Sequence, residues 1–168
     1  ISYDRLKGEG IQWPCPTPEH KGTKFLHKDR FTRGRGLFHA IEYIPPAELP
    51  DEQYPLILST GRVLYHYHTG TMTTRSQGLM ERYPESLIEI NPVDAEKLGI
   101  AEGQSVKVAS RRGSITAKAR ITERSVPGVV FMNFHFAEAA VNLLTNPALD
   151  PIGKIPEYKV CAVNVAAA

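Results

Sequence analysis

The fold is constrained most by a strict two-residue hydrophobic alternation within residues 105–121. Val106 and Val108 flank the charged Lys107, so one face of this segment is apolar and the other is polar. A glycine-containing turn follows at residues 111–114, and the alternation then resumes with apolar residues on one face: Ile115, Ala117, Ala119 and Ile121. A period of two is the repeat of a β-strand and not of a helix. The segment therefore predicts a β-hairpin with one buried face.

The rest of residues 51–168 supplies short strands and short helices. Apolar runs bounded by glycine, proline or polar residues predict strands at residues 55–59, 87–90, 128–132 and 160–165. Asn91 and Pro92 suit the N-cap and the first position of a helix, which Gly99 ends. Residues 137–144 predict a second short helix. Six short strands with two short helices predict a mainly β fold, a closed or nearly closed β-barrel, rather than a parallel α/β sheet.

Residues 1–50 follow neither period. Prolines interrupt this segment, yet it has too many apolar side chains for a typical disordered tail: Trp13, Phe25, Leu26, Phe31, Leu37 and Phe38. We expect an extended arm, part of the linker from a preceding domain, that packs on a surface outside this chain. The chain begins with Ile1 rather than methionine, and we expect it to be a piece of a longer protein.

Composition and charge argue against several classes of protein. No apolar run approaches the ~18 residues that span a membrane, so membrane insertion is not expected. Cys15 and Cys161 form neither a CxxC site nor a disulfide framework. The net charge of +2 is too small for a strong nucleic-acid footprint, and we expect no such partner despite four arginines near aromatic residues: Arg33, Arg35, Arg111 and Arg112. No signal peptide is visible. The compartment stays open, with the cytoplasm favoured over the periplasm.

The most polar segment, residues 60–75, follows the first predicted strand. Its glycines allow backbone N–H groups to approach an anion, and its threonine and arginine side chains can hydrogen-bond phosphate. The alternative is a polar surface loop. His66 and His68 share one face if the backbone is extended, but two histidines without a third ligand make a weak zinc site. The candidate binding residues are Thr60, Gly61, Arg62, His66, His68, Thr69, Gly70 and Thr71.

Two later segments carry further candidates. On a helix, Glu138 and Asn142 would share a face, and the Asn142 amide offers a donor and an acceptor to the edge of a base or pterin. Lys159 offers a point charge for phosphate, unless it is a solvated lysine at a strand edge. Phe134 is more typical of a core side chain than of a ligand contact. The motifs GxSxG, GxGxxG and GxxxxGK(S/T) are absent, which argues against hydrolase, Rossmann and P-loop sites.

Together these segments resemble the molybdopterin dinucleotide-binding domain at the C-terminus of molybdenum and tungsten oxidoreductases. The loop reads Thr60-Gly61-Arg62, then His66-x-His68-Thr69-Gly70-Thr71-Met72-Thr73, and the family helix matches residues 90–100. Further matching segments are residues 10–16, 31–37, 103–106, 111–113, 144–151 and 157–163. Residues 133–142 resemble the version found in formate dehydrogenase catalytic subunits, and periplasmic-type nitrate reductases are the alternative.

The resemblance implies a six-stranded double-psi β-barrel in residues 51–168. It implies oxidation of formate to CO₂ at a molybdenum or tungsten centre held by two pterin guanine dinucleotides, with electrons leaving through a 4Fe–4S cluster. The chain lacks the cysteine cluster and the metal-ligand motif, so we expect the cluster only in a missing N-terminal part. We therefore expect no catalytic or metal-binding residue here, and no turnover by this chain alone. The expected partners are the preceding domains of the same subunit and electron-transfer subunits.

The resemblance also implies roles for individual residues. The loop from Thr60 to Thr71 would wrap one pterin dinucleotide, with four residues foremost: Arg62, His66, His68 and Thr69. Asn142 and Lys159 match positions that contact the cofactor, Tyr158 lies beside them in the sequence, and Phe134 matches a position near the substrate entrance. The alternative is a stand-alone double-psi barrel that acts as an interaction module, in which the same loop contacts a protein partner.

Overall fold

The computed structural model describes all residues 1–168, and the chain divides into two compact units, Ile1–Tyr43 and Ile44–Ala168. This boundary lies earlier than the division we predicted at residue 50. The difference arises because residues 44–50 belong with the barrel, where Ala47 donates its backbone N–H to the Glu157 carboxylate. The assignment of residues 1–50 to a linker from a preceding domain stays a prediction.

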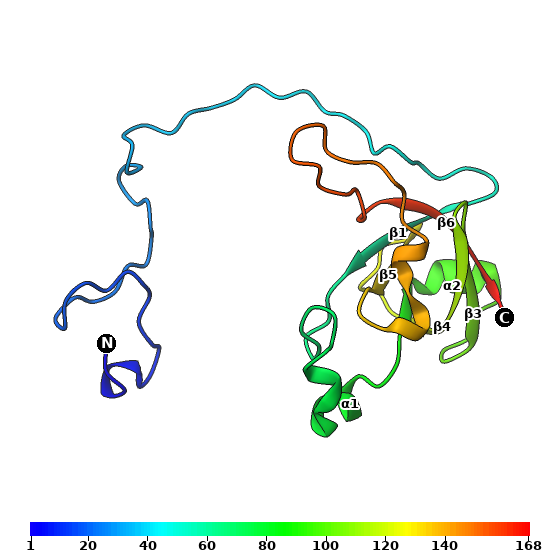
Figure 1. The fold of residues 1–168 in the computed structure, drawn as a ribbon, viewed down its shortest axis with the longest axis horizontal. Helices are drawn as coiled ribbons and strands as arrows, with labels where there is room; N and C mark the ends of the chain where they lie inside the picture. The colour runs from blue at the N-terminus through cyan, green and yellow to red at the C-terminus, as the bar shows by residue number, and fades with distance from the viewer. The chain divides into compact units, whose positions relative to one another are not determined.

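The second unit is a closed barrel of six strands (Figure 1). In chain order they are β1 (Leu56–Gly61), β2 (Leu87–Ile90), β3 (Ser105–Ser110), β4 (Gly113–Ile121), β5 (Val129–Asn133) and β6 (Cys161–Ala167). Their order around the barrel is β1-β5-β2-β4-β3-β6. Two pairs are parallel, β1 with β5 and β2 with β4, and the other pairs are antiparallel. The predicted six-stranded double-psi β-barrel is confirmed.

The hydrophobic alternation fills the barrel. In β3, Val106 and Val108 are fully buried, while Lys107 between them is exposed. The predicted hairpin pairs as expected, with Val108 opposite Ile115 and Ser110 opposite Gly113. Side chains from the other strands complete a single core that includes Leu58, Ile88, Ile90, Val130, Met132, Cys161 and Val163. Each strand therefore contributes an inward face to one core, as closure of a small barrel requires.

The helix α2 (Pro92–Leu98) begins and ends where the sequence predicts. The Asn91 side chain accepts a hydrogen bond from the Val93 backbone N–H (3.0 Å) and donates one to the Ser125 carbonyl oxygen (2.7 Å). Gly99 ends the helix in the left-handed conformation, with φ of 65°, which costs glycine no steric strain. The buried Asp94 carboxylate accepts from the Gly128 N–H (2.6 Å) and so ties the helix to the start of β5.

The predicted single helix over residues 137–144 is wrong. The segment forms two 3₁₀ turns, η3 (Ala137–Ala139) and η4 (Val141–Leu143), separated by Ala140 with ψ of 81°. The buried positions explain the break, since Ala139 and Val141 are both buried. In one continuous α-helix these two positions would point about 200° apart. Two separate turns bury both, and the expected shared face of Glu138 and Asn142 does not exist.

Within the second unit, two elements have no counterpart in the sequence-based prediction. They are η2 (Thr73–Arg75) and the helix α1 (Gln77–Arg82), and neither contains a buried residue. Gly78 lowers the helix propensity of α1, and no apolar stripe marks it in the sequence. None of the helices in the chain is long and apolar enough to cross a membrane.

The first unit has little regular structure. It contains η1 (Asp4–Leu6) and one isolated bridge between Phe31 and Gly34. Local hydrogen bonds shape its first half: the Thr23 N–H donates to the Gln12 carbonyl (3.0 Å), and the Thr23 hydroxyl donates to the Pro14 carbonyl (2.6 Å). The arm is therefore held by hydrogen bonds between its own residues.

Candidate functional site

A cavity of about 790 Å³ lies beside the end of β1, and most of the predicted site residues that face solvent line it. Its walls come from the loop after β1, the segment after β5 and the segment before β6. The lining residues are Arg62, His68, Phe134, Asn142, Thr145, Pro156, Tyr158 and Lys159. Segments far apart in the sequence therefore meet at one site.

Thr60 and Lys159 connect two walls of this cavity. The buried Thr60 hydroxyl donates to the Tyr158 carbonyl oxygen (2.7 Å), and the Lys159 ammonium donates to the Thr60 carbonyl oxygen. The same ammonium lies 5.2 Å from the centroid of the Tyr158 ring, within the range of a cation–π contact. The contacts hold the Lys159 charge at the cavity while the residue itself stays exposed.

The charge of the lining is one-sided. Arg62 and Lys159 contribute two positive charges, and no carboxylate is among the lining residues. Asn142 and Thr145 add an amide and a hydroxyl, which can donate and accept hydrogen bonds. Tyr158 and Phe134 add flat apolar rings. A site of this kind suits a ligand that joins phosphate groups to a planar heterocycle.

His66 and His68 do not share a face, contrary to the expectation from an extended backbone. The chain turns at His68, which has φ of 49°, so the backbone between the two histidines is not a strand. His68 is exposed and lines the cavity, whereas His66 is buried away from it. No group of three or more histidine, cysteine or acidic side chains that could hold a metal exists in the chain, so the zinc alternative has no support.

His66 is held by hydrogen bonds at both ring nitrogens. Its Nε2 lies 2.8 Å from the Tyr83 carbonyl oxygen and must donate to it, since a carbonyl only accepts. Its Nδ1 lies 3.1 Å from the Thr73 hydroxyl, which also accepts from the Tyr67 N–H (3.2 Å). The bond to Tyr83 requires a proton on Nε2. His66 therefore anchors the loop from inside, and contact between His66 and a cofactor stays a prediction.

A buried aromatic cluster surrounds His66. The rings of His66 and His135 are 4.5 Å apart between centroids, and Phe136 packs against both. Burial, and secondarily the charge of His66, lowers the pKa of His135 to about 4. Its Nε2 is buried without a hydrogen-bond partner. Nearby, the fully buried Asn133 donates to the Tyr83 hydroxyl (3.2 Å).

The remaining loop candidates lie outside the cavity lining. The hydroxyls of Thr69 and Thr71 are 2.9 Å apart and exposed. Gly70 between them is buried with φ of 76°, and its carbonyl accepts from both the N–H and the hydroxyl of Thr74. Gly61 is required by close packing, since a Cβ there would lie 2.6 Å from the Phe131 ring. Roles for Thr69, Gly70, Thr71 and Gly61 toward a ligand stay predictions.

Sequence reasoning missed two lining residues, Thr145 and Pro156. Thr145 follows Asn142 in the turn after η4, and its hydroxyl donates to the Asn142 carbonyl (3.0 Å). Both residues stand within or next to segments that carry the family resemblance, which was the available signal. Arg62 also lines a second cavity of about 280 Å³, together with Arg120, Arg124 and Glu89.

Comparisons with known proteins identify the family of this chain. Residues 56–162 match the family model described as "Molydopterin dinucleotide binding domain". The chain is 60% identical to the "F420-dependent formate dehydrogenase subunit alpha" of Methanocaldococcus jannaschii, over 98% of this chain and 25% of the relative. It is 43% identical to the "Assimilatory nitrate reductase catalytic subunit" of Bacillus subtilis, over 98% of this chain and 24% of that protein. The chain thus spans about a quarter of the length of these relatives.

Among solved structures, acetylene hydratase from Pelobacter acetylenicus matches with a TM-score of 0.61 at 16% sequence identity. The match covers 68% of this chain and 18% of that one, and it supports the fold alone. The family model covers the first five strands and the start of β6, and it includes every residue that lines the cavity. The chain therefore belongs to the molybdopterin dinucleotide-binding domain family.

Proposed function

We propose that this chain is the cofactor-binding part of a formate dehydrogenase catalytic subunit. In this proposal the barrel binds one pterin guanine dinucleotide of a molybdenum or tungsten centre that oxidises formate to CO₂. The observation that carries the proposal is the cavity beside β1, where Arg62 and Lys159 provide two positive charges with no carboxylate in the lining. A dinucleotide presents the diphosphate that such a pair of cations would bind.

The residues of the site fit the cofactor by chemistry. When bound, the pterin cofactor holds the metal that exchanges the two electrons, and the protein supplies binding and orientation. Arg62 and Lys159 would bind the diphosphate, with backbone N–H groups of the loop from Thr60 to Thr71 as further donors. The Asn142 amide would hydrogen-bond the edge of the guanine or the pterin. Tyr158 and His68 would contact the flat face of that ring. Phe134 would lie toward the substrate entrance.

Identity to relatives favours formate as the substrate. The formate dehydrogenase alpha subunits of Methanocaldococcus jannaschii and Methanococcus maripaludis are 60% and 52% identical to this chain. The nitrate reductase catalytic subunit of Bacillus subtilis is 43% identical, which keeps nitrate reduction as the second candidate. The names of the formate dehydrogenases make coenzyme F420 the first electron acceptor to test.

The proposal places other components outside this chain. The relatives are about four times as long, so preceding domains of the same subunit would supply the 4Fe–4S cluster and the other half of the cofactor cleft. Electron-transfer subunits would then accept the electrons. A stand-alone interaction module is less well supported, because these relatives carry the matching segment as one part of a long enzyme subunit.

The test is binding of GDP, a guanosine diphosphate fragment of the proposed cofactor, to the 168-residue chain by titration calorimetry. Arg62→Gln and Lys159→Gln should each weaken binding about five- to tenfold, because each removes one charge-assisted hydrogen bond to phosphate. Lys107→Gln, on the exposed face of β3, is the matched control and should leave the affinity unchanged. Circular dichroism checks that each variant is folded.

Failure of GDP to bind, or equal affinity in all three variants, would contradict the assignment of this cavity. The substrate is tested separately in the full-length subunit loaded with cofactor. Formate oxidation with F420 as acceptor supports the formate assignment. Activity with nitrate and none with formate would make the second candidate correct.

A further inference from the structure

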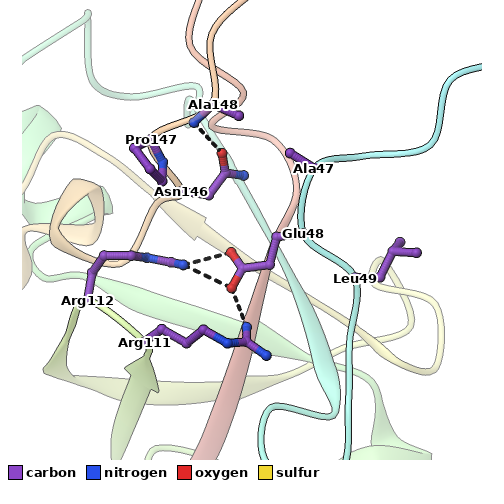
Figure 2. Close-up of a pocket in the computed structure, with 8 residues that line it drawn as sticks. All are labelled: Ala47, Glu48, Leu49, Arg111, Arg112, Asn146, Pro147 and Ala148. Carbon is purple, nitrogen blue, oxygen red and sulfur yellow. Dashed lines mark hydrogen bonds and ion pairs between the residues drawn. The ribbon is translucent and has the colours of Figure 1, made fainter.

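On the barrel, a cluster of ion pairs joins the segment before β1 to the turn between β3 and β4 (Figure 2). Arg112 donates from Nη1 to the Glu48 carboxylate (2.9 Å), and its Nη2 lies 2.8 Å from the other carboxylate oxygen. Arg111 pairs with the same carboxylate and also with Asp51. Two arginines from one turn therefore hold one glutamate, whose side chain is only 10% exposed.

Arg112 differs from Arg111 in a second set of contacts. Its Nε and Nη2 both donate to the Leu144 carbonyl oxygen, at 3.1 and 2.6 Å. Leu144 is fully buried and ends the turn η4, whose middle residue is Asn142. Arg111 instead lies over the ring of Tyr54, with its guanidinium carbon 4.7 Å from the ring centroid. Only Arg112 connects the ion-pair cluster to the wall of the cavity.

The segment before β1 also supports the wall of the cavity that comes from the segment before β6. The Ala47 N–H donates to the Glu157 carboxylate (3.1 and 3.2 Å). The Asn146 amide donates to the carbonyl oxygens of Glu157 (3.1 Å) and Val160 (2.7 Å), on either side of Tyr158 and Lys159. Ala47 therefore bonds to Glu157 in the segment before β6, and its neighbour Glu48 bonds to Arg112, which contacts the end of η4.

Electrostatics favour the ion pair between Glu48 and Arg112 at neutral pH. Burial works to raise the pKa of Glu48, but hydrogen bonds from Arg112 and Arg111 outweigh it and the net pKa is lowered. The charged groups that face this carboxylate are the two guanidinium ions, with Asp51 on the far side of Arg111. Glu48 is therefore ionised, and Arg112 is held between its carboxylate and the Leu144 carbonyl oxygen.

We propose that Arg112, held by Glu48, is a positioning residue that fixes the η4 turn and so the place of Asn142 in the dinucleotide cavity. The effect on ligand binding rests on the proposed function, whereas the effect of Arg112 on the η4 turn does not. Lysine cannot replace arginine here, because one ammonium cannot reproduce the planar fork that bonds the carboxylate and the carbonyl together. Arg112→Lys keeps the charge and removes the geometry, which makes it the informative variant.

The first readout is hydrogen–deuterium exchange of a peptide covering residues 141–146 in the 168-residue chain. The amides of Leu143 and Leu144 bond to carbonyls of the turn and report on its opening. Arg112→Lys should raise their exchange about fivefold, since it weakens the bonds at Leu144. The matched control is Arg111→Lys, which alters the same carboxylate pair without touching Leu144, and exchange should stay at the wild-type rate. Glu48→Gln should act in the same direction as Arg112→Lys, with a smaller increase.

The second readout is the affinity for GDP, which Arg112→Lys should lower about three- to tenfold while Arg111→Lys changes it less than about twofold. Unchanged exchange at residues 141–146 in Arg112→Lys overturns the proposal, whatever GDP does. Raised exchange with unchanged GDP affinity overturns the positioning role. A wild-type chain that binds no GDP overturns the proposed function instead, and exchange alone then decides whether Arg112 holds the turn.

Discussion

The barrel and the arm use apolar side chains in opposite ways. In the barrel, Leu58 and Met132 are 0% exposed, while in the arm Trp13 is 77% exposed and Phe38 is 97% exposed. The arm does not lack apolar residues. It lacks a period that would place them on one face, so they cannot gather into a core. A regular spacing, more than apolar content, decides which part of this chain buries its own side chains.

The comparison explains what each unit needs from outside. The barrel closes on itself and leaves no unpaired edge strand, so its main chain and core are satisfied within the unit. The arm has little regular structure and exposes a long apolar series. Exposed apolar area of this kind marks a surface that another part of a protein covers. The preceding domains of the proposed full-length subunit would provide that cover.

The largest difference between the two units should be in the reactivity of their free cysteines. Cys161 is fully buried in β6, and burial raises the pKa of its thiol to about 11, whereas Cys15 in the arm is half-buried. Cys161 should react with a thiol reagent at least about a thousandfold more slowly, because it must wait for the barrel to open. Labelling with Ellman's reagent at pH 8 measures both rates. In Cys15→Ser, rapid labelling of the native chain would contradict a closed barrel.

Truncation of an apolar side chain should cost several kcal/mol of unfolding free energy in the barrel core and almost none in the arm. Leu58→Ala should lower the free energy of unfolding of the barrel by about 2–5 kcal/mol, through lost burial and the cavity it leaves. Phe38→Ala, its counterpart in the arm, should change it by less than about 0.5 kcal/mol. Urea titration followed by circular dichroism measures both, since the single tryptophan, Trp13, lies in the arm and does not report on the barrel. Equal losses would mean that the arm packs on the barrel.

Within the barrel unit, the two loop histidines provide a finer contrast. His66→Ala should lower the free energy of unfolding by about 2–3 kcal/mol, because it leaves the buried Tyr83 carbonyl without a donor and opens a cavity. His68→Ala should cost less than about 0.5 kcal/mol, because His68 is exposed and makes no such bond. Thermal or urea unfolding compares the pair. A large cost at His68 would show that the loop is anchored differently.

The smallest effect concerns pH and the buried His135. Its pKa is lowered from 6.5 to about 4 in the folded state, so the unfolded chain takes up the proton first as pH falls. Stability from this group is therefore complete above pH 6.5 and is lost as pH falls toward 4. The loss should be about 1–2 kcal/mol after allowance for partial solvent screening. His135→Phe should flatten this part of the curve, and an unchanged slope would show that His135 takes up its proton equally in both states.

Several local features could be read from the sequence because their causes lie between near neighbours. The hairpin over β3 and β4 follows from a two-residue period, and the start and end of α2 follow from Asn91 and Gly99. The predicted single helix over residues 137–144 is wrong because it too was inferred from neighbouring residues alone. Local propensity favours one helix there, but the core needs both Ala139 and Val141, and only a break at Ala140 lets both reach it.

For the candidate site, the sequence determined which residue types were present but not which of them meet. Arg62, Asn142 and Lys159 were identified in three separate segments, and closure of the barrel brings them to one cavity. Tertiary structure alone decided that His66 is an internal anchor while His68 faces the cavity. It also decided that Arg112 bonds a carbonyl 32 positions away in the chain. Spacing along the chain governs the period and the caps, whereas burial and long-range hydrogen bonds exist only once the strands have closed.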